Sequence, residues 1–514
     1  MSRRLLRRVL VANRGEIAVR VIRTCRRLGI ETVLTVSDAD AGSLPARLAD
    51  QVIPIGHGPA GASYLSVDAV LRAAVAAGAD AVHPGYGFLS ENARLARACG
   101  AAGIVFIGPA PETLEATGDK LAAREHAVAA GLPVLPGGHV TPEVPRAGDS
   151  DAEDGGGAGG GRDGAGDGRD GDAAALAARI GYPVLVKAAG GGGGRGLRVV
   201  RDPAGLAQAV ALASAEAGAA FGDPRVYLER YVERGRHVEV QLLGDGEQVI
   251  HLGDRDCSVQ RRYQKLIEEA PAPGLGEYLR ERLRGAAVAL GEHLRYRGAG
   301  TVEFLVDAGS ASTGDGEFYF LEVNARIQVE HPVTEAVTGI DIVAEQLAIA
   351  EGRPLRLKQA DVMFAGHAIE VRLNAEDPAS DFRPGPGTVT RAVFPAATLP
   401  AATLPAATGP ARDAAGKDGT GVRVDTHLQA GTTVPPYYDS LLAKVIARGG
   451  DRDGALRALR SALDACAIDG VSTNLDLHRA LLADAEFAAG GVDTGYLARW
   501  LAGAAAGAVD GADG

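Results

Sequence analysis

The chain has 514 residues, 46% of them hydrophobic, and a formal net charge of −12. At roughly 100 to 200 residues per domain, this length predicts about three domains. The acidic balance argues against a broad nucleic-acid surface, so any anion site must be local. No apolar run approaches the roughly 18 residues of a membrane helix, and we expect neither a membrane nor a nucleic-acid partner. The cysteines lack CxxC spacing, which favours a reducing cytoplasm over a disulfide framework or a zinc site: Cys25, Cys99, Cys257 and Cys466.

The N-terminal segment alternates between strand and helix patterns. "VLVANRG" at 9–15 predicts a buried strand that ends in a turn, and "EIAVRVIRTCRRLGI" has apolar residues at helical spacing. "ETVLTVSD" then predicts a second strand. This β-α-β order is typical of a parallel sheet with crossover helices, so we expect a doubly wound α/β domain as far as about residue 114.

Three later segments predict little regular structure. Residues 142–172 are rich in Gly, Asp and Pro and predict a disordered loop. The proline-containing repeat within 395–421 predicts a surface excursion between strands. The tail, 501–514, is also expected to be disordered. Between the insertions, long alternating segments predict an antiparallel sheet.

The stretch "VLVKAAGGGGGRGLRVV" at 184–200 places five glycines between two apolar runs. It lacks the GK[ST] ending of a Walker motif, and a strand replaces the helix that follows a dinucleotide fingerprint. A solvent-exposed hairpin turn is the simpler interpretation, but five glycines exceed what a turn needs. We therefore favour a mobile lid over phosphates, with Lys187 supplying a fixed charge.

Two strand segments carry oxygen ligands that suit a magnesium ion. "GTVEFLVD" contains Glu303, and "FYFLEVN" contains Glu322 and Asn324. Hard oxygen donors of this kind hold Mg²⁺ against nucleotide phosphates. The alternative is that they are ordinary surface acids, but their apolar neighbours make an unpaired charge costly.

The adjoining "ARIQVEH" has a row of polar residues at alternate positions. If this segment is extended, Arg326, Gln328 and Glu330 share one face. Such a row could bind a small oxyanion and deprotonate it. "RRYQKLIEE" adds Lys265 to the charged residues, although a charge run is more often a solvated face.

Several longer strings resemble the biotin carboxylases of the ATP-grasp superfamily. They are "ANRGEIAVR", "HPGYGFLSEN", "GDK", "KAAGGGGGRG", "RDCSVQRRYQK", "EEAPAPG", "ARIQVEHPVTE", "EVRLNAEDP" and "VPPYYDSLLAKV", in the family's order. The resemblance implies a multidomain α/β and α+β fold. Its parts would be an N-terminal α/β domain (1–114), an ATP-grasp domain (115–350, lid about 133–204) and a C-terminal biotin carboxylase domain (351–500).

The resemblance also implies a role for each matching residue. ATP would contact Lys120, Lys187, Gly193, Gly194, Glu229, Arg230, Tyr231, Val232, His237, Gln260 and Tyr263. Tyr263 stands where many relatives have histidine. Mg²⁺ or Mn²⁺ would be held by Glu303, Glu322 and Asn324. Bicarbonate would meet Lys265, Arg326, Gln328 and the Val329 backbone, with Glu330 as base and Arg372 beside the biotin enolate.

The activity implied is ATP-dependent carboxylation of biotin, most simply the first half-reaction of acetyl-CoA carboxylase. Propionyl-CoA, methylcrotonyl-CoA and pyruvate carboxylases share this half-reaction and remain alternatives. A degenerate ATP-binding protein is a further alternative. The sequence has no Met-Lys-Met, so we expect biotin on a separate carrier protein, a carboxyltransferase partner and a homodimer.

Overall fold

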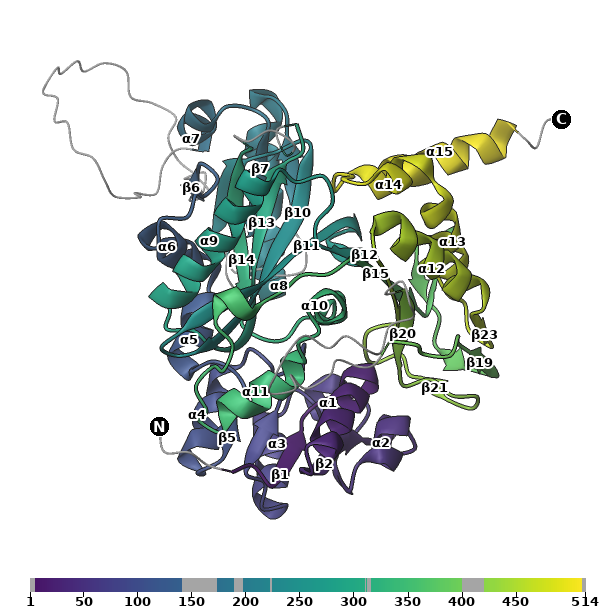
Figure 1. Cartoon of the computed structure of the whole chain (residues 1–514). Coiled ribbons are helices and arrows are strands. Elements are labelled where there is room, and N and C mark those ends of the chain that lie inside the picture. Colours follow the sequence, from purple (N-terminus) through teal and green to yellow (C-terminus); the bar gives the residue numbers. More distant parts are fainter. Residues whose placement is uncertain are drawn as a thin grey trace, which may run out of the picture. The chain divides into compact units, whose positions relative to one another are not determined.

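The computed structural model describes residues 5–140, 173–188, 197–221, 224–309, 311, 316–399 and 420–510. The chain forms two compact units, residues 1–133 with 234–514, and residues 134–233 (Figure 1). The insertion 142–172, the five-glycine run and most of the insertion 395–421 lie outside the described residues. The structural expectations for these segments therefore stay predictions.

The N-terminal part of the larger unit contains a parallel sheet with the strand order β3-β2-β1-β4-β5. Val9, Leu10 and Val11 of β1 are fully buried, as expected for a central parallel strand that is covered on both faces. The predicted β-α-β pattern is confirmed. The strands are β1 Arg8–Val11, β2 Glu31–Ser37, β3 Gln51–Gly56, β4 Ala81–His83 and β5 Val105–Phe106, and the helices are α1 Gly15–Arg27, α2 Leu44–Leu48, α3 Val67–Ala76, α4 Ala93–Ala101, α5 Pro111–Gly118 and α6 Lys120–Ala129.

An eight-stranded sheet follows in the order β14-β13-β10-β11-β12-β15-β22-β20, and all its pairings are antiparallel. This confirms the antiparallel pattern predicted from alternation. The sheet crosses the boundary expected at residue 350, because β12 pairs with β15. Its strands are β10 Gly235–Asp245, β11 Val249–Arg261, β12 Gln264–Ala270, β13 Arg297–Asp307, β14 Phe318–Asn324, β15 His367–Asn374, β20 Gly421–Thr426 and β22 Leu441–Gly449.

Helices cover both faces of this sheet. α9 (Glu277–His293) packs on β10 and β11, while α10 (His331–Thr338) and α12 (Arg452–Asp464) pack on β15 and β22. Ile369, Val371 and Leu373 of β15 face the core that contains α12, whereas Ala368 packs with residues of α10. The two faces of β15 therefore differ: the face toward α12 is apolar, and the face toward α10 carries the polar residues.

The smaller unit contains a four-stranded sheet with the order β6-β9-β7-β8. β7 (Val184–Ala188) and β8 (Arg198–Val200) pair antiparallel, which confirms the predicted strands on either side of the glycine run. β9 is part of this sheet, although the sequence presents it as continuous with the β10 strand. The other elements are β6 Gly137–Val140, α7 Ala173–Ile180, α8 Leu206–Phe221 and β9 Val226–Arg230.

The remaining elements form the C-terminal part of the larger unit and the connection to it. They are α11 Ile342–Ala350, β16 Glu376–Asp377, β17 Arg383–Pro384, β18 Gly387–Thr388, β19 Arg391–Val393, β21 Thr433–Val434, β23 Ala467–Asp469, α13 Leu475–Ala483, α14 Ala485–Ala489 and α15 Tyr496–Asp510.

The expectation of a disordered tail is wrong for residues 501–510, which continue α15. Tyr496 at the start of this helix is buried and packs near Phe487. The following residues are rich in alanine, the best helix former, so the docked first turn extends. None of the helices in the described ranges has the length and apolar character that a membrane crossing requires.

Candidate active site

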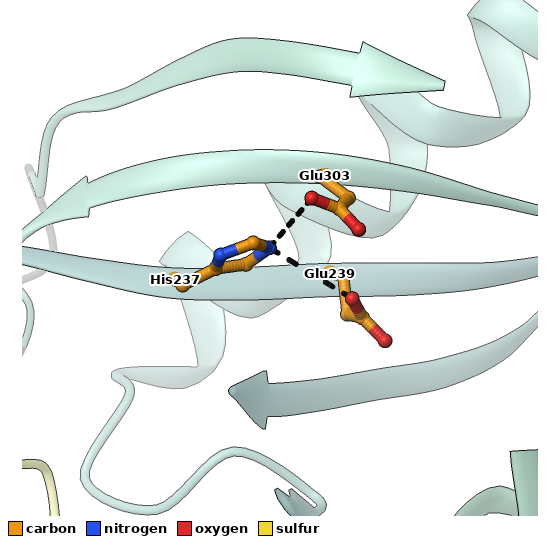
Figure 2. A group of neighbouring side chains, drawn as sticks. All are labelled: His237, Glu239 and Glu303. Atoms are coloured by element: carbon orange, nitrogen blue, oxygen red, sulfur yellow. Dashed lines mark ion pairs between the residues drawn. The ribbon is translucent and has the colours of Figure 1, made fainter. Parts of the chain in front are cut away.

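Charged side chains form a row across four neighbouring strands of the large sheet. Antiparallel register places Glu303 opposite both Glu322 on β14 and Glu239 on β10, and Glu239 opposite Arg255 on β11. His237 lies beside the row, with Nε2 2.8 Å from Glu303 and 3.8 Å from Glu239 (Figure 2). Burial lowers the pKa of His237, but the charge and hydrogen bond of Glu303 together with the charge of Glu239 outweigh it, and the net pKa is raised.

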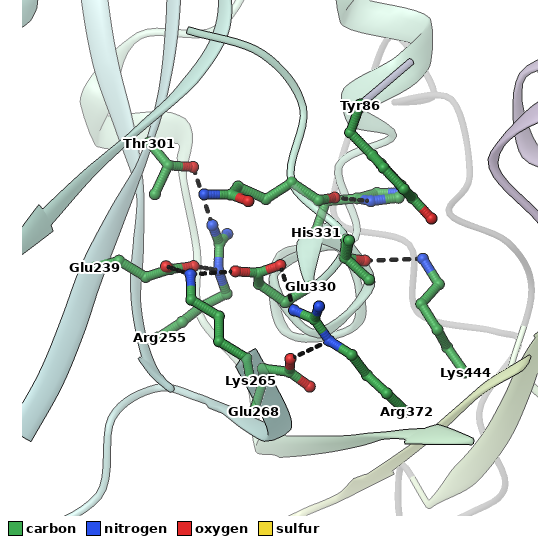
Figure 3. A network of polar contacts seen from close by, with 12 residues as sticks. Tyr86, Glu239, Arg255, Lys265, Glu268, Thr301, Glu330, His331, Arg372 and Lys444 are labelled. Carbon is green, nitrogen blue, oxygen red and sulfur yellow. Dashed lines mark hydrogen bonds and ion pairs between the residues drawn. The ribbon is translucent and has the colours of Figure 1, made fainter. Parts of the chain in front are cut away.

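Lys265 on β12 is the centre of the site. Its Nζ donates to Glu239 at 2.5 Å, Glu303 at 2.9 Å and Glu330 at 2.6 Å (Figure 3). Burial lowers the pKa of Lys265, but these three carboxylates outweigh it and hold the pKa well above its ordinary value. Lys265 therefore stays charged and is not part of a solvated face.

Glu303, Glu322 and Asn324 provide oxygen donors that suit a divalent ion. Asn324 Nδ2 donates to Glu303 at 2.8 Å, which holds the amide next to the carboxylate. Burial and the charge of Glu303 raise the pKa of Glu322. A hard cation between the two carboxylates would relieve this repulsion, so the residues fit Mg²⁺ or Mn²⁺.

The segment 325–330 is a bend and a turn that lead into α10, and not the extended strand expected from the alternation. Its side chains nevertheless meet. Arg326 donates to Gln328 at 3.0 Å, and Gln328 Nε2 donates to Glu303 at 3.1 Å. Glu91 anchors the bend by accepting from the Ala325 N–H and from Arg326 Nε, both at 2.9 Å. The residues converge because the chain folds back, and not because they share one strand face.

Glu330 lies between two cations. Its carboxylate accepts from Lys265 at 2.6 Å and from Arg372 Nη2 at 3.0 Å, and Arg372 Nε donates to Glu268 at 2.5 Å. Burial raises the pKa of Glu330, but Lys265 and Arg372 outweigh it and the pKa lies well below its ordinary value. Glu330 is therefore ionised at neutral pH and able to accept a proton.

The Val329 carbonyl is fixed by a lysine from the C-terminal part of the chain. Lys444 Nζ donates to this oxygen at 2.8 Å and lies 3.1 Å from Glu16. The Tyr86 hydroxyl donates to the same Glu16 carboxylate. Three segments far apart in sequence, carrying Glu16, Tyr86 and Lys444, thus orient the peptide next to Glu330.

The larger unit also carries other positions expected to contact ATP. Lys120 begins α6, where Asp119 caps the helix by accepting from two backbone N–H groups at 2.9 Å. Gln260 pairs with Lys265 across the β11–β12 hairpin. Tyr263 lies at the tip of this hairpin with φ +67° and 54% exposure. Gln260 is thus held next to Lys265 by the strand register, whereas Tyr263 projects from the tip.

The smaller unit carries the remaining residues that are expected to contact ATP. Lys187 on β7 donates to Glu229 on β9 at 2.6 Å, and Arg230 at the end of β9 is exposed. The Tyr231 N–H donates to the Pro183 carbonyl at 3.0 Å, and Val232 follows directly. Gly193 and Gly194 lie outside the described residues.

The sequence interpretation did not single out several residues of the cluster. Glu239 lies two residues after His237 on the same strand, so alternation alone could have indicated it. Arg255 donates to Glu239 at 2.5 Å and to Thr301 at 3.1 Å. Glu91 and Lys444 come from distant segments, and no local pattern connects them to the site.

Two features define the class of protein. Neighbouring strands carry paired carboxylates, and a separate unit has two antiparallel strands on either side of a glycine run in the sequence. Together they are typical of the ATP-grasp class. In agreement, the family described as "Carbamoyl-phosphate synthase L chain, ATP binding domain" matches residues 162–358. The N-terminal and C-terminal domain families of biotin carboxylase match residues 5–114 and 370–499. The chain belongs to the biotin carboxylase family, and both the resemblance and the fold class predicted from the sequence are confirmed.

Individual relatives match over nearly the whole chain. The biotin carboxylase of Pseudomonas aeruginosa is 47% identical over 498 residues, covering 97% of this chain and 99% of the relative. A pyruvate carboxylase subunit of Methanothermobacter thermautotrophicus is 43% identical over 491 residues, covering 95% and 89%. The biotin carboxylase domain of Hydrogenobacter thermophilus 2-oxoglutarate carboxylase, a dimer solved with MgADP, ADP and bicarbonate, has a TM-score of 0.82 at 40% identity, covering 96% and 98%.

Proposed function

We propose that this chain carboxylates biotin with ATP and bicarbonate, as a ligase that forms a carbon–nitrogen bond. The observation that carries the proposal is the cluster around Lys265, whose Nζ lies within 2.9 Å of Glu239, Glu303 and Glu330. Arg372 contacts the other oxygen of Glu330. In a member of the biotin carboxylase family, this cluster brings an anion site, a base and a second cation together.

The chemistry follows from the charges of the cluster. Lys265, Arg326, Gln328 and the Val329 backbone bind bicarbonate, and ionised Glu330 removes its proton. The resulting oxygen attacks the γ-phosphorus of ATP, and the bond to ADP breaks. Carboxyphosphate divides into CO₂ and phosphate, the phosphate takes the ureido proton of biotin, and the ureido nitrogen attacks CO₂. Arg372 stabilises the enolate oxygen that forms on biotin.

The remaining predicted positions would hold the nucleotide and its metal. Mg²⁺ or Mn²⁺, held by Glu303, Glu322 and Asn324, would neutralise charge on the phosphates of ATP. ATP would be bound by Lys120, Lys187, Gly193, Gly194, Glu229, Arg230, Tyr231, Val232, His237, Gln260 and Tyr263. The predicted lid, about 133–204, falls largely within the compact unit 134–233, so this unit would supply the lid.

We also propose which molecule finally accepts the carboxyl group. We favour the biotin carboxylase subunit of an acetyl-CoA carboxylase, working in the cytoplasm with a biotin carboxyl carrier protein and carboxyltransferase subunits. The match to a pyruvate carboxylase subunit keeps that acceptor as the second candidate. A homodimer is supported by the dimer of the Hydrogenobacter domain.

The test measures ADP release with Mg²⁺ and bicarbonate, with and without free biotin. Glu330→Gln removes the base, and Lys265→Ala removes the cation that holds three carboxylates. We expect both to lose at least about 10²-fold in biotin-dependent turnover. Glu281→Gln, an exposed glutamate on α9, is the matched control and should leave turnover unchanged. ATP binding without any turnover, even with a biotinylated carrier protein present, would contradict the proposal.

A further inference from the structure

A second group of charged residues lies on the face of the sheet that α10 covers. Register places Glu268 of β12 directly opposite Glu370 of β15, and Arg372 opposite Lys444 of β22. Directly paired residues of antiparallel strands point to the same face. Ala270, Ala368 and Ile446 identify this face, because they pack with Val333 and Val337 of α10.

Glu370 is buried here without a counterion. It is fully buried, and in the part of the chain that the structure describes neither carboxyl oxygen accepts a hydrogen bond. The nearby cations have other partners. Arg372 is bonded to Glu268 and Glu330, and Lys444 to the Val329 carbonyl and Glu16. An ionised carboxylate in this place is strongly unfavourable, so Glu370 is a neutral carboxylic acid.

A neutral acid carries an O–H donor, and a suitable acceptor lies on the opposing strand. Glu268 uses Oε1 to accept from Arg372, while its buried Oε2 has no hydrogen-bond partner among the described residues. Directly opposed residues have Cβ atoms about 4.5 to 5.5 Å apart, which is within reach of two glutamate side chains. We propose that Glu370 keeps its proton and donates it to Glu268 Oε2, so that the pair shares one proton and positions Arg372.

This inference deepens the proposed function, on which its catalytic consequence rests. With one proton, the pair presents a single negative charge to Arg372. Without it, Arg372 would lie among three full carboxylates, counting Glu330, and would stabilise an enolate less well. Burial raises the pKa of Glu268 to about 7 and that of Glu370 well above its ordinary value. The other titratable groups facing the pair are Lys265, Lys444, Glu330 and Cys257.

The first test needs no activity. Infrared spectra at neutral pH are compared between the wild-type chain and Glu370→Gln, in which the amide replaces the protonated acid. We expect the wild-type spectrum to contain the C=O stretch of a protonated carboxyl group that the variant lacks. Glu351→Gln is the matched control, because Glu351 is buried but paired with Arg353. A wild-type spectrum without this band, or a band that persists in Glu370→Gln, would overturn the proposal.

Glu268→Gln covers the case in which Glu370→Gln does not fold. Its amide can donate to Glu370 and carries no charge, so the protonated-carboxyl band should disappear at a lower pH than in the wild type. A band that disappears at the same pH in both would also overturn the proposal.

The positioning role is tested by the pH profile of turnover with biotin. Glu370→Gln cannot lose the proton, so its alkaline limb should move up by about one pH unit or more. Glu268→Gln removes the carboxylate from Arg372 and should raise KM for biotin more than it lowers kcat. An unchanged alkaline limb in Glu370→Gln would show that the pair does not position Arg372. An inactive wild-type chain would contradict only the proposed function.

Discussion

At the scale of single residues, Lys444 is the most consequential side chain outside the predicted site. It is fully buried and supports both the Val329 carbonyl and the Glu16 carboxylate. Burial lowers the pKa of Lys444, but the surrounding carboxylates, Glu16 above all, outweigh this effect and raise it, so Lys444 stays charged. A methionine could fill the space but would remove the donor to the Val329 carbonyl and the cation beside Glu16.

We expect Lys444→Met to lower the free energy of unfolding by about 3 to 5 kcal/mol. Urea titration measures this change, and KM for bicarbonate should rise because the Val329 peptide loses its support. Lys358→Met is the control, since Lys358 is exposed. A loss below about 1 kcal/mol would show that the Val329 peptide and Glu16 do not depend on Lys444.

How far the site can be predicted depends on the range over which each residue acts. Arg326, Gln328 and Glu330 are close in sequence. Their order therefore predicts an anion site with a base, even though the segment is a bend and not the expected strand. Glu91 and Lys444 reach the site only through the tertiary fold. Periodicity describes local geometry, so it cannot identify partners that lie far apart along the chain.

At the scale of elements, a buried ion network joins α1, α10 and β20. Arg20 of α1 and Arg423 of β20 both donate to Glu335 of α10, at 2.8 and 2.7 Å. Arg423 also binds Asp425 through two bonds of 2.9 and 2.6 Å. Burial raises the pKa of Asp425, but Arg423 outweighs this and lowers it. The helix that begins directly after Glu330 is thus connected to its neighbours by charges with almost no access to water.

We expect Arg423→Met to cost about 3 to 5 kcal/mol in unfolding free energy, because Glu335 and Asp425 would remain as buried charges. Denaturant unfolding measures this cost. Arg391→Met, at an arginine that is 61% exposed in its ion pair, should change stability by less than about 1 kcal/mol. Equal effects of the two substitutions would contradict a special role for the buried network.

At the scale of the whole molecule, alternation and motif order predict the architecture well. The parallel N-terminal sheet and the later antiparallel strands follow from local patterns. The continuation of one sheet through β12 and β15 does not, because no sequence pattern reports which distant strands become neighbours. Helix α15 shows the same limit, since docking of Tyr496 decides whether the alanine-rich tail forms a helix.

The buried acids also give the molecule a characteristic dependence of stability on pH. Between about pH 4.5 and 7, both Glu268 and Glu370 are ionised in the unfolded chain, while the folded pair keeps its shared proton, because burial raises the pKa of Glu370 well above its ordinary value and that of Glu268 to about 7. The folded state then binds more protons, so stability falls as pH rises through this window. Glu303, Glu330 and Asp425 have lowered pKa values and act oppositely, removing stability as pH falls below about 4.5.

We therefore expect maximum stability on the acid side of neutrality, measured as the urea midpoint between about pH 4 and 9. Glu268→Gln removes one acid of the pair and the charge that helps to raise the pKa of Glu370, so its midpoint should fall less steeply from about pH 5 to 8 than that of the wild type. Glu351→Gln should leave the slope unchanged, because Glu351 accepts from the Leu6 N–H and pairs with Arg353, and is not part of the Glu268–Glu370 pair. A wild-type midpoint that rises steadily across this range would mean that Glu268 and Glu370 ionise freely in the folded protein, which their burial opposes.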